Sequence, residues 1–324
     1  MPRGATPLSE TPTIQIIFTA PADEGVAEAI SRLERVAVEE HAALGPEGLL
    51  EAARRADILV TRSFQRVSRA VLEAGAAKGL QAVVQASAGL DNIDAFAAAE
   101  FGIDIEAVDP GNAVSVAELV LLSLLALVRH ACAHWQATSQ GVWPERDRLL
   151  DHELRGKRLG LVGLGRTGSQ VARRASAFEM ELWAHDPYLA PEVFSRLGVR
   201  RARSLPELLA RLDALSLHCP LTDETRGLIG STELALLPRG AILVNASRGE
   251  ILDERALAVA LDEGRLAGAA LDVFSTEPPG RRSIVSHPRV LATPHLGGHT
   301  VESHLARGHS LRVALGEIIA RLMS

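Results

Sequence analysis

The chain has 324 residues, enough for two domains of ordinary size, and 47% hydrophobic and 23% charged residues are typical of a globular protein. A net charge of −6 excludes the strongly basic surface on which nucleic-acid binding depends. The two cysteines, Cys132 and Cys219, form neither a disulfide framework nor a CxxC metal pair. We therefore expect no metal and a reducing compartment.

The N-terminus and the longest apolar run indicate a chain without a targeting or membrane segment. Residues 1–13 are rich in Pro, Thr and Ser and lack an apolar stretch, which predicts a disordered tail rather than a signal peptide. The run Val116–Val128 is too short to span a bilayer and contains Glu118. It predicts a buried helix, with a subunit interface as a further role. We expect a soluble, cytoplasmic protein with no membrane partner.

Apolar strand-like runs alternate with helical stretches through the first hundred residues. The predicted strands are Ile14–Thr19, Asp57–Thr61, Gln81–Gln85 and Ile103–Val108, and the predicted helices lie near 24–35, 68–76 and 94–101. Repeated alternation of this kind predicts a small α/β domain with a parallel sheet. Pro110-Gly111-Asn112 interrupts the pattern before a long helix, Val114–Arg129, and marks a crossing into a second domain.

A glycine motif opens the second domain. The apolar run before it ends at Gly163, in Gly163-x-Gly165-x-x-Gly168, and a predicted helix, Ser169–Phe178, follows. A second strand then ends at Asp186. This is the dinucleotide-binding fingerprint in its full context, with the pyrophosphate at the helix N-terminus and an acid for the ribose hydroxyls. An acid repels a 2′-phosphate, so Asp186 favours NAD over NADP.

Six strands are predicted in the second domain, which is a complete dinucleotide-binding sheet. They are Leu159–Gly163, Glu181–His185, Ala214–Leu217, Ala241–Asn245, Ala267–Leu271 and Val290–Ala292. A last helix, near 301–323, is too small to be a domain and is expected to return to the first one. The predicted domains are 113–296 for the dinucleotide and 1–112 with 297–324 for the substrate, with a substrate cleft between two lobes.

Three polar segments follow the last three strands of this sheet. They contain Arg248, a planar fork suited to a carboxylate, Glu277, which precedes two prolines, and His295. Taken singly, each also has a structural explanation. Arg248 could form a surface ion pair, Glu277 could be a solvated loop carboxylate, and His295 could have no catalytic role. Together they predict a carboxylate-supported acid/base histidine beside an anion-binding arginine, because carboxyl ends of parallel strands meet at one edge.

At this point the chain resembles the NAD-dependent D-isomer-specific 2-hydroxyacid dehydrogenase family, in its phosphoglycerate dehydrogenase-like or hydroxypyruvate reductase-like branch. The resemblance covers nearly the whole chain. It rests on SAGLDNID (87–94), GNAVSVAEL (111–119), GLGRTG (163–168), HDP (185–187), HCPLTDETRGLI (218–229), NASRGEILDE (245–254), ALDVFSTEPP (270–279) and TPHLGGHT (293–300). It implies a Rossmann-type nucleotide domain and a smaller flavodoxin-like α/β domain.

The resemblance also implies a role for each matching residue. His295 matches the acid/base, Glu277 its carboxylate partner and Arg248 the substrate-orienting arginine. The positions implied for NAD are Gly163, Gly165, Arg166, Thr167, Gly168, Asp186, Cys219, Pro220, Ala246, Ser247, Asp272 and Gly298. Those implied for the substrate are Arg62, Ser87, Ala88 and Gly89.

The implied reaction is reversible hydride transfer between NAD(H) and a small 2-hydroxy or 2-oxo acid. The alternative is an NAD-sensing, corepressor-like binding protein on the same scaffold, because fold alone does not separate the two. The family is commonly dimeric, and Val116–Val128 fits a dimer interface. Trp135 is either a contact to a neighbouring subunit or, in our preferred interpretation, a core residue.

The substrate is where the chain departs from the phosphoglycerate dehydrogenase pattern. That branch often has an arginine two residues before the position of Ser87, to meet the substrate phosphate, whereas this chain has Gln85. The single positive charge of Arg62 is little to neutralise a doubly charged phosphate. Glyoxylate, hydroxypyruvate and other small 2-oxo acids therefore remain open.

Overall fold

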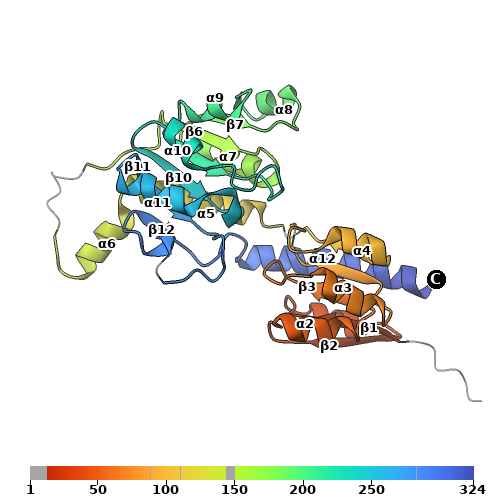
Figure 1. Ribbon diagram of the computed structural model, residues 1–324. Helices are drawn as coiled ribbons and strands as arrows, with labels where there is room; N and C mark the ends of the chain where they lie inside the picture. The colour runs from red at the N-terminus through yellow and green to blue at the C-terminus, as the bar shows by residue number, and fades with distance from the viewer. Residues whose placement is uncertain (1–12, 88, 110, 144–149, 282) are drawn as a thin grey trace, which may run out of the picture. The chain divides into compact units, whose positions relative to one another are not determined.

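The structure, a computed structural model, describes residues 13–324 except 88, 110, 144–149 and 282 (Figure 1). The chain forms two compact units. The smaller consists of Met1–Gly111 with Val301–Ser324, and the larger is Asn112–Thr300.

The return to the smaller unit comes four residues later than the sequence suggested. The Gly297 N–H donates to the Asp272 carboxylate at 2.8 Å, and the hydroxyls of Ser115 and Thr300 are 2.8 Å apart. These bonds hold the segment 297–300 to the larger unit, so that the boundary lies after Thr300 rather than after residue 296.

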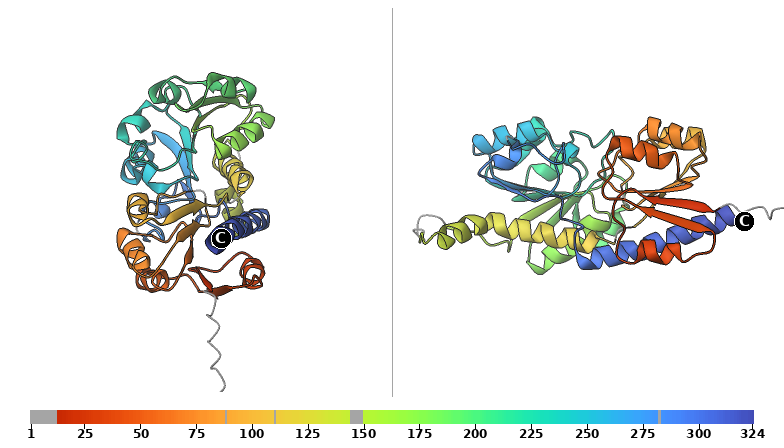
Figure 2. Two further views of the ribbon diagram at one scale, coloured as in Figure 1. Left: turned by 90° about the vertical axis from the view of Figure 1, so that its right-hand side faces the viewer. Right: turned by 90° about the horizontal axis from the view of Figure 1, so that it is seen from below.

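The smaller unit is a five-stranded parallel sheet in the order β2-β1-β3-β4-β5, the order of flavodoxin-like folds. Its strands are β1 (Ile14–Phe18), β2 (Val36–Glu40), β3 (Ile58–Thr61), β4 (Ala82–Gln85) and β5 (Asp104–Ala107). Its helices are α1 (Val26–Ser31), α2 (Pro46–Ala53), α3 (Arg69–Ala76), α4 (Ala95–Phe101) and α12 (Val301–Met323). Helices α1 and α12 pack on one face and α2, α3 and α4 on the other, as Figure 2 shows for this unit.

Two elements of this unit were missed from the sequence, β2 and α2. Strand β2 is an edge strand, and its residues stay partly exposed. It therefore lacks the continuous apolar run that identifies a strand buried on both faces. Helix α2 is short and begins with a proline, so that its apolar period covers barely two turns.

The larger unit is a seven-stranded parallel sheet in the order β8-β7-β6-β9-β10-β11-β12. Its strands are β6 (Arg158–Val162), β7 (Glu181–His185), β8 (Arg200–Arg201), β9 (Ala214–Leu217), β10 (Ala241–Asn245), β11 (Leu266–Leu271) and β12 (Val290–Ala292). The order is that of a dinucleotide-binding sheet with one added strand at the end, and it reverses between β6 and β9. The predicted Rossmann-type fold is therefore confirmed, and only the two-residue strand β8 was missed.

Helices cover both faces of this sheet because its strands alternate apolar side chains between the faces. In β6, Leu159 and Leu161 pack with one cluster and Val162 with the other. The first face carries α5 (Ala113–Val128), α7 (Arg166–Ala177) and α8 (Pro191–Arg196). The second carries α9 (Leu205–Leu209), α10 (Ser231–Leu236) and α11 (Glu254–Asp262), and short 3-10 turns η1 (Gly249–Ile251) and η2 (Ile284–Ser286) lie in the loops.

Helix α5 is followed, across a 68° bend, by α6 (Ala131–Ser139). The bend lies at His130, whose φ is 45°. None of the described residues of α6 is buried, and Trp135 is 68% exposed, so the expectation of core packing for Trp135 is wrong. Among the described residues no single helix has the length and apolar character to cross a membrane; α5 and α6 meet that test only as a bent pair.

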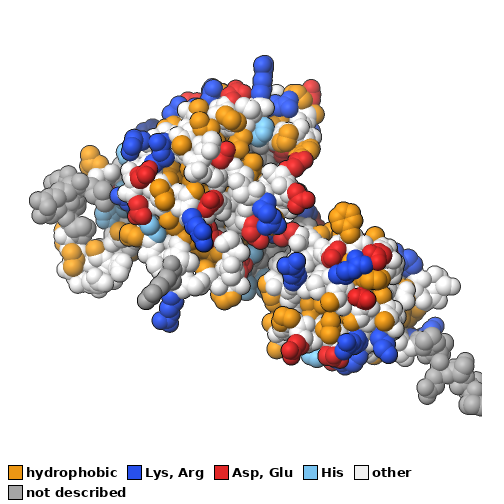
Figure 3. Space-filling view, viewed as in Figure 1, with side chains coloured by type: hydrophobic (Ala, Val, Ile, Leu, Met, Phe, Trp, Pro, Cys, Tyr) orange, Lys and Arg blue, Asp and Glu red, His pale blue; other side chains and the backbone are white. Residues whose placement is uncertain are grey.

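Acidic and basic side chains are interspersed over the face of each unit seen in Figure 3. This distribution agrees with the net charge of −6. A face on which both signs of charge are mixed does not produce the strong positive potential that attracts a polyanion.

Candidate functional site

The glycine turn after β6 has the three properties that a pyrophosphate cradle requires. Gly163 has φ +90°, and a Cβ there would lie 2.9 Å from the backbone N of Cys219. A Cβ on Gly168 would lie 2.3 Å from the Gly163 carbonyl oxygen, so this glycine lets α7 approach the strand. At Gly165 a Cβ would meet nothing within 4 Å, which leaves open space at the helix N-terminus.

Helix α7 begins at Arg166, three residues earlier than the sequence predicted. Arg166 and Thr167 thus form the first turn of the helix, where backbone N–H groups lack partners within the helix. The macrodipole favours a negative charge at this end. The residues present therefore fit the diphosphate of a dinucleotide.

Asp186, at the end of β7, connects that strand to the glycine turn. One carboxylate oxygen accepts the Leu164 N–H at 3.0 Å and the other accepts the Tyr188 N–H at 3.1 Å. Each oxygen can accept a further bond, so the carboxylate is held in place and can still receive hydroxyl donors. The Tyr188 hydroxyl in turn donates to Glu224.

The end of β9 supplies two neutral groups beside the turn. Burial, together with the charge of Asp186, raises the pKa of the Cys219 thiol to about 11, so it stays protonated at neutral pH and is a poor nucleophile. Burial lowers the pKa of His218 to about 4, and its Nε2 lies 2.9 Å from the Ser216 hydroxyl. His218 was missed from the sequence; its only signal was its place in HCP, before Cys219 and the exposed Pro220.

The end of β10 fixes Arg248 through a short polar turn. Asn245 is buried; its amide donates to the Arg248 carbonyl at 2.9 Å and its carbonyl accepts from both N–H and hydroxyl of Ser247. A Cβ on Gly249 would lie 1.9 Å from the Phe274 carbonyl carbon. Only glycine permits this approach, so Gly249, for which the sequence predicted no role, brings the arginine turn against the loop that carries Glu277.

Glu277 and His295 form a pair in this unit. Nδ1 of His295 lies 2.8 Å from one Glu277 carboxylate oxygen, and the other oxygen accepts the Phe274 N–H at 3.1 Å. The His295 side chain is 42% exposed and that of Glu277 is 31% exposed, so the pair is half-buried and accessible. His295 has φ 56°, an uncommon conformation for a non-glycine residue that is often found at functional sites.

The pair shifts both pKa values toward the ionised forms. The hydrogen bond to Glu277 raises the pKa of His295 against the opposing effect of burial, and the charges of Glu277 and Asp272 add to it. For Glu277, burial by itself would raise the pKa, but the hydrogen bond and charge of His295, with the Phe274 N–H and the charge of Arg248, lower it below its usual range. The pair therefore favours the protonated form of the imidazole and the ionised form of the carboxylate.

Asp272, 4% exposed at the end of β11, organises the His295 loop. One carboxylate oxygen accepts the Thr293 hydroxyl at 2.6 Å and the Leu296 N–H at 2.7 Å, and the other accepts the Gly297 N–H. One acceptor position on this carboxylate remains open for a ligand. At Gly298 a Cβ would lie 2.8 Å from the side-chain nitrogen of Asn112, so this glycine too allows a close approach.

All predicted residues of this unit follow strands β6, β7, β9, β10, β11 and β12 in turn. Because the strands are parallel, the residues share the carboxyl edge of one sheet, at and beside its switch point. The structure places Glu277 and His295 in direct contact, whereas Arg248 acts on both through its charge. The remaining predicted positions, Ala246 and Ser247 among them, lie along that edge.

The predicted substrate residues belong to the smaller unit. Arg62 follows β3, and Ser87 and Gly89 follow β4, while Ala88 lies outside the described residues. Gln85 is fully buried and does not present its amide to a ligand: it bonds the Thr61 hydroxyl, the Asn92 amide at 2.8 Å and the Gly89 carbonyl at 3.4 Å. Its role here is to hold the loop that follows β4.

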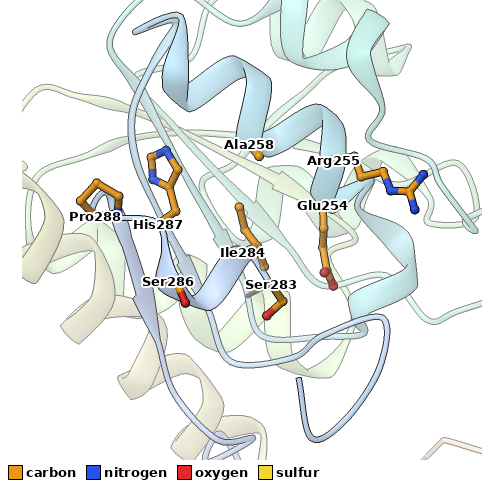
Figure 4. A pocket seen from close by; sticks show the side chains of 8 residues that line it. All are labelled: Glu254, Arg255, Ala258, Ser283, Ile284, Ser286, His287 and Pro288. Atoms are coloured by element: carbon orange, nitrogen blue, oxygen red, sulfur yellow. The ribbon is translucent and has the colours of Figure 1, made fainter. Parts of the chain in front are cut away.

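A separate hollow of about 620 Å³ lies between α11 and η2 (Figure 4). It is lined by Glu254, Arg255, Ala258, Ser283, Ile284, Ser286, His287 and Pro288. Two of its polar side chains have partners in the protein: Glu254 accepts the Ser275 N–H at 2.6 Å, and the His287 ring lies 3.2 Å from Asp262. The Ser283 hydroxyl is buried without a hydrogen-bond partner among the described residues. None of the predicted site residues lines it.

Residues 121–297 match the family described as D-isomer specific 2-hydroxyacid dehydrogenase, NAD binding domain. A D-3-phosphoglycerate dehydrogenase of Methanocaldococcus jannaschii is 42% identical over 296 residues, which are 91% of this chain and 55% of that protein. The chain thus spans about half the length of the curated relatives it matches.

Among solved structures, the TT0316 protein of Thermus thermophilus superposes with a TM-score of 0.85 at 33% identity, covering 96% of this chain and 97% of that one. A glyoxylate reductase from Paecilomyes thermophila gives 0.85 at 30% identity, over 95% and 96% of the two chains.

Proposed function

Because this chain belongs to the D-isomer specific 2-hydroxyacid dehydrogenase family and contains its NAD-binding domain, we propose that it is an NAD-dependent oxidoreductase that interconverts a small D-2-hydroxy acid and the corresponding 2-oxo acid. The observation that carries the proposal is the 2.8 Å contact between His295 Nδ1 and Glu277, with the charge of Arg248 acting on both.

His295 is the proton donor in the reductive direction. Its Nδ1 is engaged with Glu277, so the proton leaves from Nε2 toward the carbonyl oxygen of the 2-oxo acid. Glu277 holds the imidazole in one orientation and stabilises its cationic form, as the raised pKa of His295 reflects. In the oxidative direction the neutral imidazole accepts the hydroxyl proton.

Arg248 orients the substrate through its carboxylate. The bonds of Asn245 to the Arg248 turn and the close approach of Gly249 to residue 274 fix its backbone next to the acid/base pair. A guanidinium binds a carboxylate through two parallel N–H donors, which sets the direction from which the carbonyl faces His295.

The nucleotide-binding edge fits NAD. The glycine turn with Arg166 and Thr167 would hold the diphosphate, Asp186 the adenosine ribose, Cys219 and Pro220 the adenine side, and Ala246, Ser247, Asp272 and Gly298 the nicotinamide side. Bound there, the nicotinamide would supply the hydride.

The substrate class is a small 2-oxo acid, with Arg62, Ser87, Ala88 and Gly89 as the predicted contacts of the smaller unit. The relatives include a D-3-phosphoglycerate dehydrogenase and a glyoxylate reductase, which differ in whether the substrate carries a phosphate.

A homodimer and a cytoplasmic location are further parts of the proposal. Exposed apolar residues of α5 and α6, Leu122 and Trp135, support the dimer.

A panel of 2-oxo acids with NADH tests the proposal. We expect NADH oxidation with at least one member of a panel of glyoxylate, pyruvate, hydroxypyruvate, oxaloacetate and phosphohydroxypyruvate. His295→Gln should reduce kcat by roughly 10²–10⁴-fold, the usual contribution of a general acid, and leave NADH binding intact. NADH binding without turnover across the panel would favour the NAD-sensing alternative.

A further inference from the structure

The smaller unit contains a charged cluster of four side chains at the carboxyl edge of its sheet. Asp23 follows β1 and Arg62 follows β3, while His304 and Arg307 project from the first turns of α12. Asp23 is 6% exposed and Arg307 is 7% exposed, so two members of the cluster are buried. The Arg62 side chain is 23% exposed and thus accessible from solvent.

The Asp23 carboxylate is bonded chiefly to Arg307. The guanidinium of Arg307 donates to both of its oxygens, with Nε 2.8 Å from one of them. His304 Nδ1 lies 3.3 Å from the same carboxylate. Helix α12 reaches this position because Gly308 has no side chain: a Cβ there would lie 3.3 Å from the Asp23 Cβ and 3.2 Å from Val26.

Arg62 is the second arginine of the cluster. Its Nη1 lies 3.8 Å from Asp23, beyond hydrogen-bond distance, so this carboxylate does not bond it directly. Burial lowers the pKa of Arg62, the charge of Arg307 lowers it further and Asp23 opposes both. The Arg62 guanidinium is therefore partly dehydrated. The two arginines of the cluster share one carboxylate, that of Asp23, and this excess of positive charge favours binding of an oxyanion.

The backbone at Arg62 is held in place by the side-chain amides of Gln65, which is buried, and Asn92, which is partly buried. The Arg62 N–H donates to Gln65 at 3.1 Å, and the Asn92 amide donates to the Arg62 carbonyl at 3.3 Å. Gln65 in turn donates to the Thr19 carbonyl at 3.0 Å. Gln85, which precedes the loop after β4, is neutral and buried and offers no charge to a ligand.

We propose that Arg307 controls this site: by neutralising Asp23 it keeps Arg62 available for an oxyanion, and the preferred substrate is a 2-oxo acid with a second acidic group, carboxylate or phosphate. Asp23 and Arg307 are then positioning residues that act through Arg62. The substrate class rests on the proposed dehydrogenase function, whereas the charge relationship among the three residues does not.

A double-mutant design separates this role from a structural one. Arg307→Met leaves Asp23 without its main partner, and Asp23 then pairs with Arg62; we expect inorganic phosphate, titrated into the full chain with saturating NADH to occupy the nucleotide site, to bind at least tenfold more weakly. Adding Asp23→Asn to Arg307→Met removes the competing carboxylate and should restore the affinity to within about threefold. Arg62→Met should abolish phosphate binding in either background.

Kinetics on paired substrates identify the ligand class. In Arg307→Met, KM should rise at least tenfold for oxaloacetate or phosphohydroxypyruvate and by a smaller factor for pyruvate, which lacks a second acidic group, with recovery in the double variant. Preference for phosphohydroxypyruvate over oxaloacetate identifies phosphate as the second group, and the reverse identifies carboxylate. Because removing one partner of a buried pair is destabilising, Asp23→Asn alone is the second test, and it should bind phosphate more tightly than the parent.

The proposal is overturned if the double variant binds phosphate no better than Arg307→Met, if Arg62→Met leaves phosphate binding unchanged, or if Asp23→Asn weakens it. Restored phosphate binding in a protein that turns over none of the oxo acids would refute the dehydrogenase function and the substrate class but keep the charge relationship. Turnover of the oxo acids with no effect of these substitutions on phosphate binding or on KM would support the dehydrogenase function but refute the charge relationship.

Discussion

The backbone N–H of His295 donates to the carbonyl oxygen of Asp272 at 2.9 Å, and the Asp272 carboxylate binds the loop on both sides of the histidine. The loop that carries the acid/base residue is thus attached by four hydrogen bonds to a buried residue at the end of the neighbouring strand. A histidine held at φ 56° requires such support, since the conformation is unfavourable for a residue with a side chain.

Asp272→Asn should therefore reduce kcat. The new amide nitrogen faces backbone or hydroxyl donors whichever way it is turned, so at least one buried donor loses its acceptor and the loop shifts. We expect a loss on the order of 10- to 100-fold in kcat, as for a displaced catalytic group, measured by steady-state kinetics. Thr293→Val, which removes one donor, is the milder control; an unchanged kcat in Asp272→Asn would contradict this account.

Glu277→Gln should shift the pH dependence of the reductive reaction to lower pH. Reduction needs protonated His295, so the rate falls as pH rises through the pKa of His295, which Glu277 raises. Without the carboxylate, only the charge of Asp272 still opposes burial and the charge of Arg248, so that pKa falls. The measurement is kcat/KM against pH, and the oxidative reaction should move in the same direction. A profile that keeps its midpoint would show that Glu277 does not support the charge.

Two alanine substitutions in the glycine turn should have different consequences, one for the stability of the fold and the other for NADH binding. Gly168→Ala places a Cβ 2.3 Å from the Gly163 carbonyl and should lower the free energy of unfolding by about 1–3 kcal/mol. Gly165→Ala meets open space and should change stability by less than about 0.5 kcal/mol, yet weaken NADH binding. Chemical denaturation and NADH titration check both. Tight NADH binding by Gly165→Ala would place the pyrophosphate elsewhere.

Asp186→Asn should relax the preference for NAD. The substitution removes the negative charge that repels a 2′-phosphate and keeps an acceptor for the Leu164 N–H. We expect the ratio of kcat/KM for NADH over NADPH to fall at least tenfold, about 1.4 kcal/mol. Glu224→Gln, which alters the exposed partner of Tyr188, serves as the matched control. An unchanged ratio would show that Asp186 does not set cofactor choice.

The exposed apolar side chains of α5 and α6 should form a dimer contact. Leu122 is 57% exposed and Trp135 is 68% exposed. Sedimentation of the parent chain should give a dimer, and Leu122→Glu with Trp135→Glu should give a monomer, because a charge at a buried apolar contact is unfavourable. Phe96→Glu, at a 92% exposed position of α4, should stay dimeric. A monomeric parent would remove the proposed interface.

Local patterns determined much of this protein. The strands of the larger unit, its glycine turn and the order of the polar segments were readable because buried parallel strands are continuous apolar runs and polar residues follow their carboxyl ends. The edge strand β2 and the helix α2 escaped because partly exposed or very short elements carry little of that signal. The predicted burial of Trp135 was wrong because an aromatic residue on a helix gives the same sequence signal whether its side chain is buried or exposed.

Only the tertiary structure decided which residues meet. Glu277 and His295 are separated in the chain, and the structure places them in contact. Gly249 brings the Arg248 turn against the loop of Glu277 through a close approach to residue 274 that no spacing rule reveals. The cluster of Asp23, Arg62 and Arg307 joins residues from opposite ends of the chain, because α12 returns to the N-terminal sheet. Sequence patterns report burial and local conformation, whereas charge balance depends on distances through space, and those exist only in the folded chain.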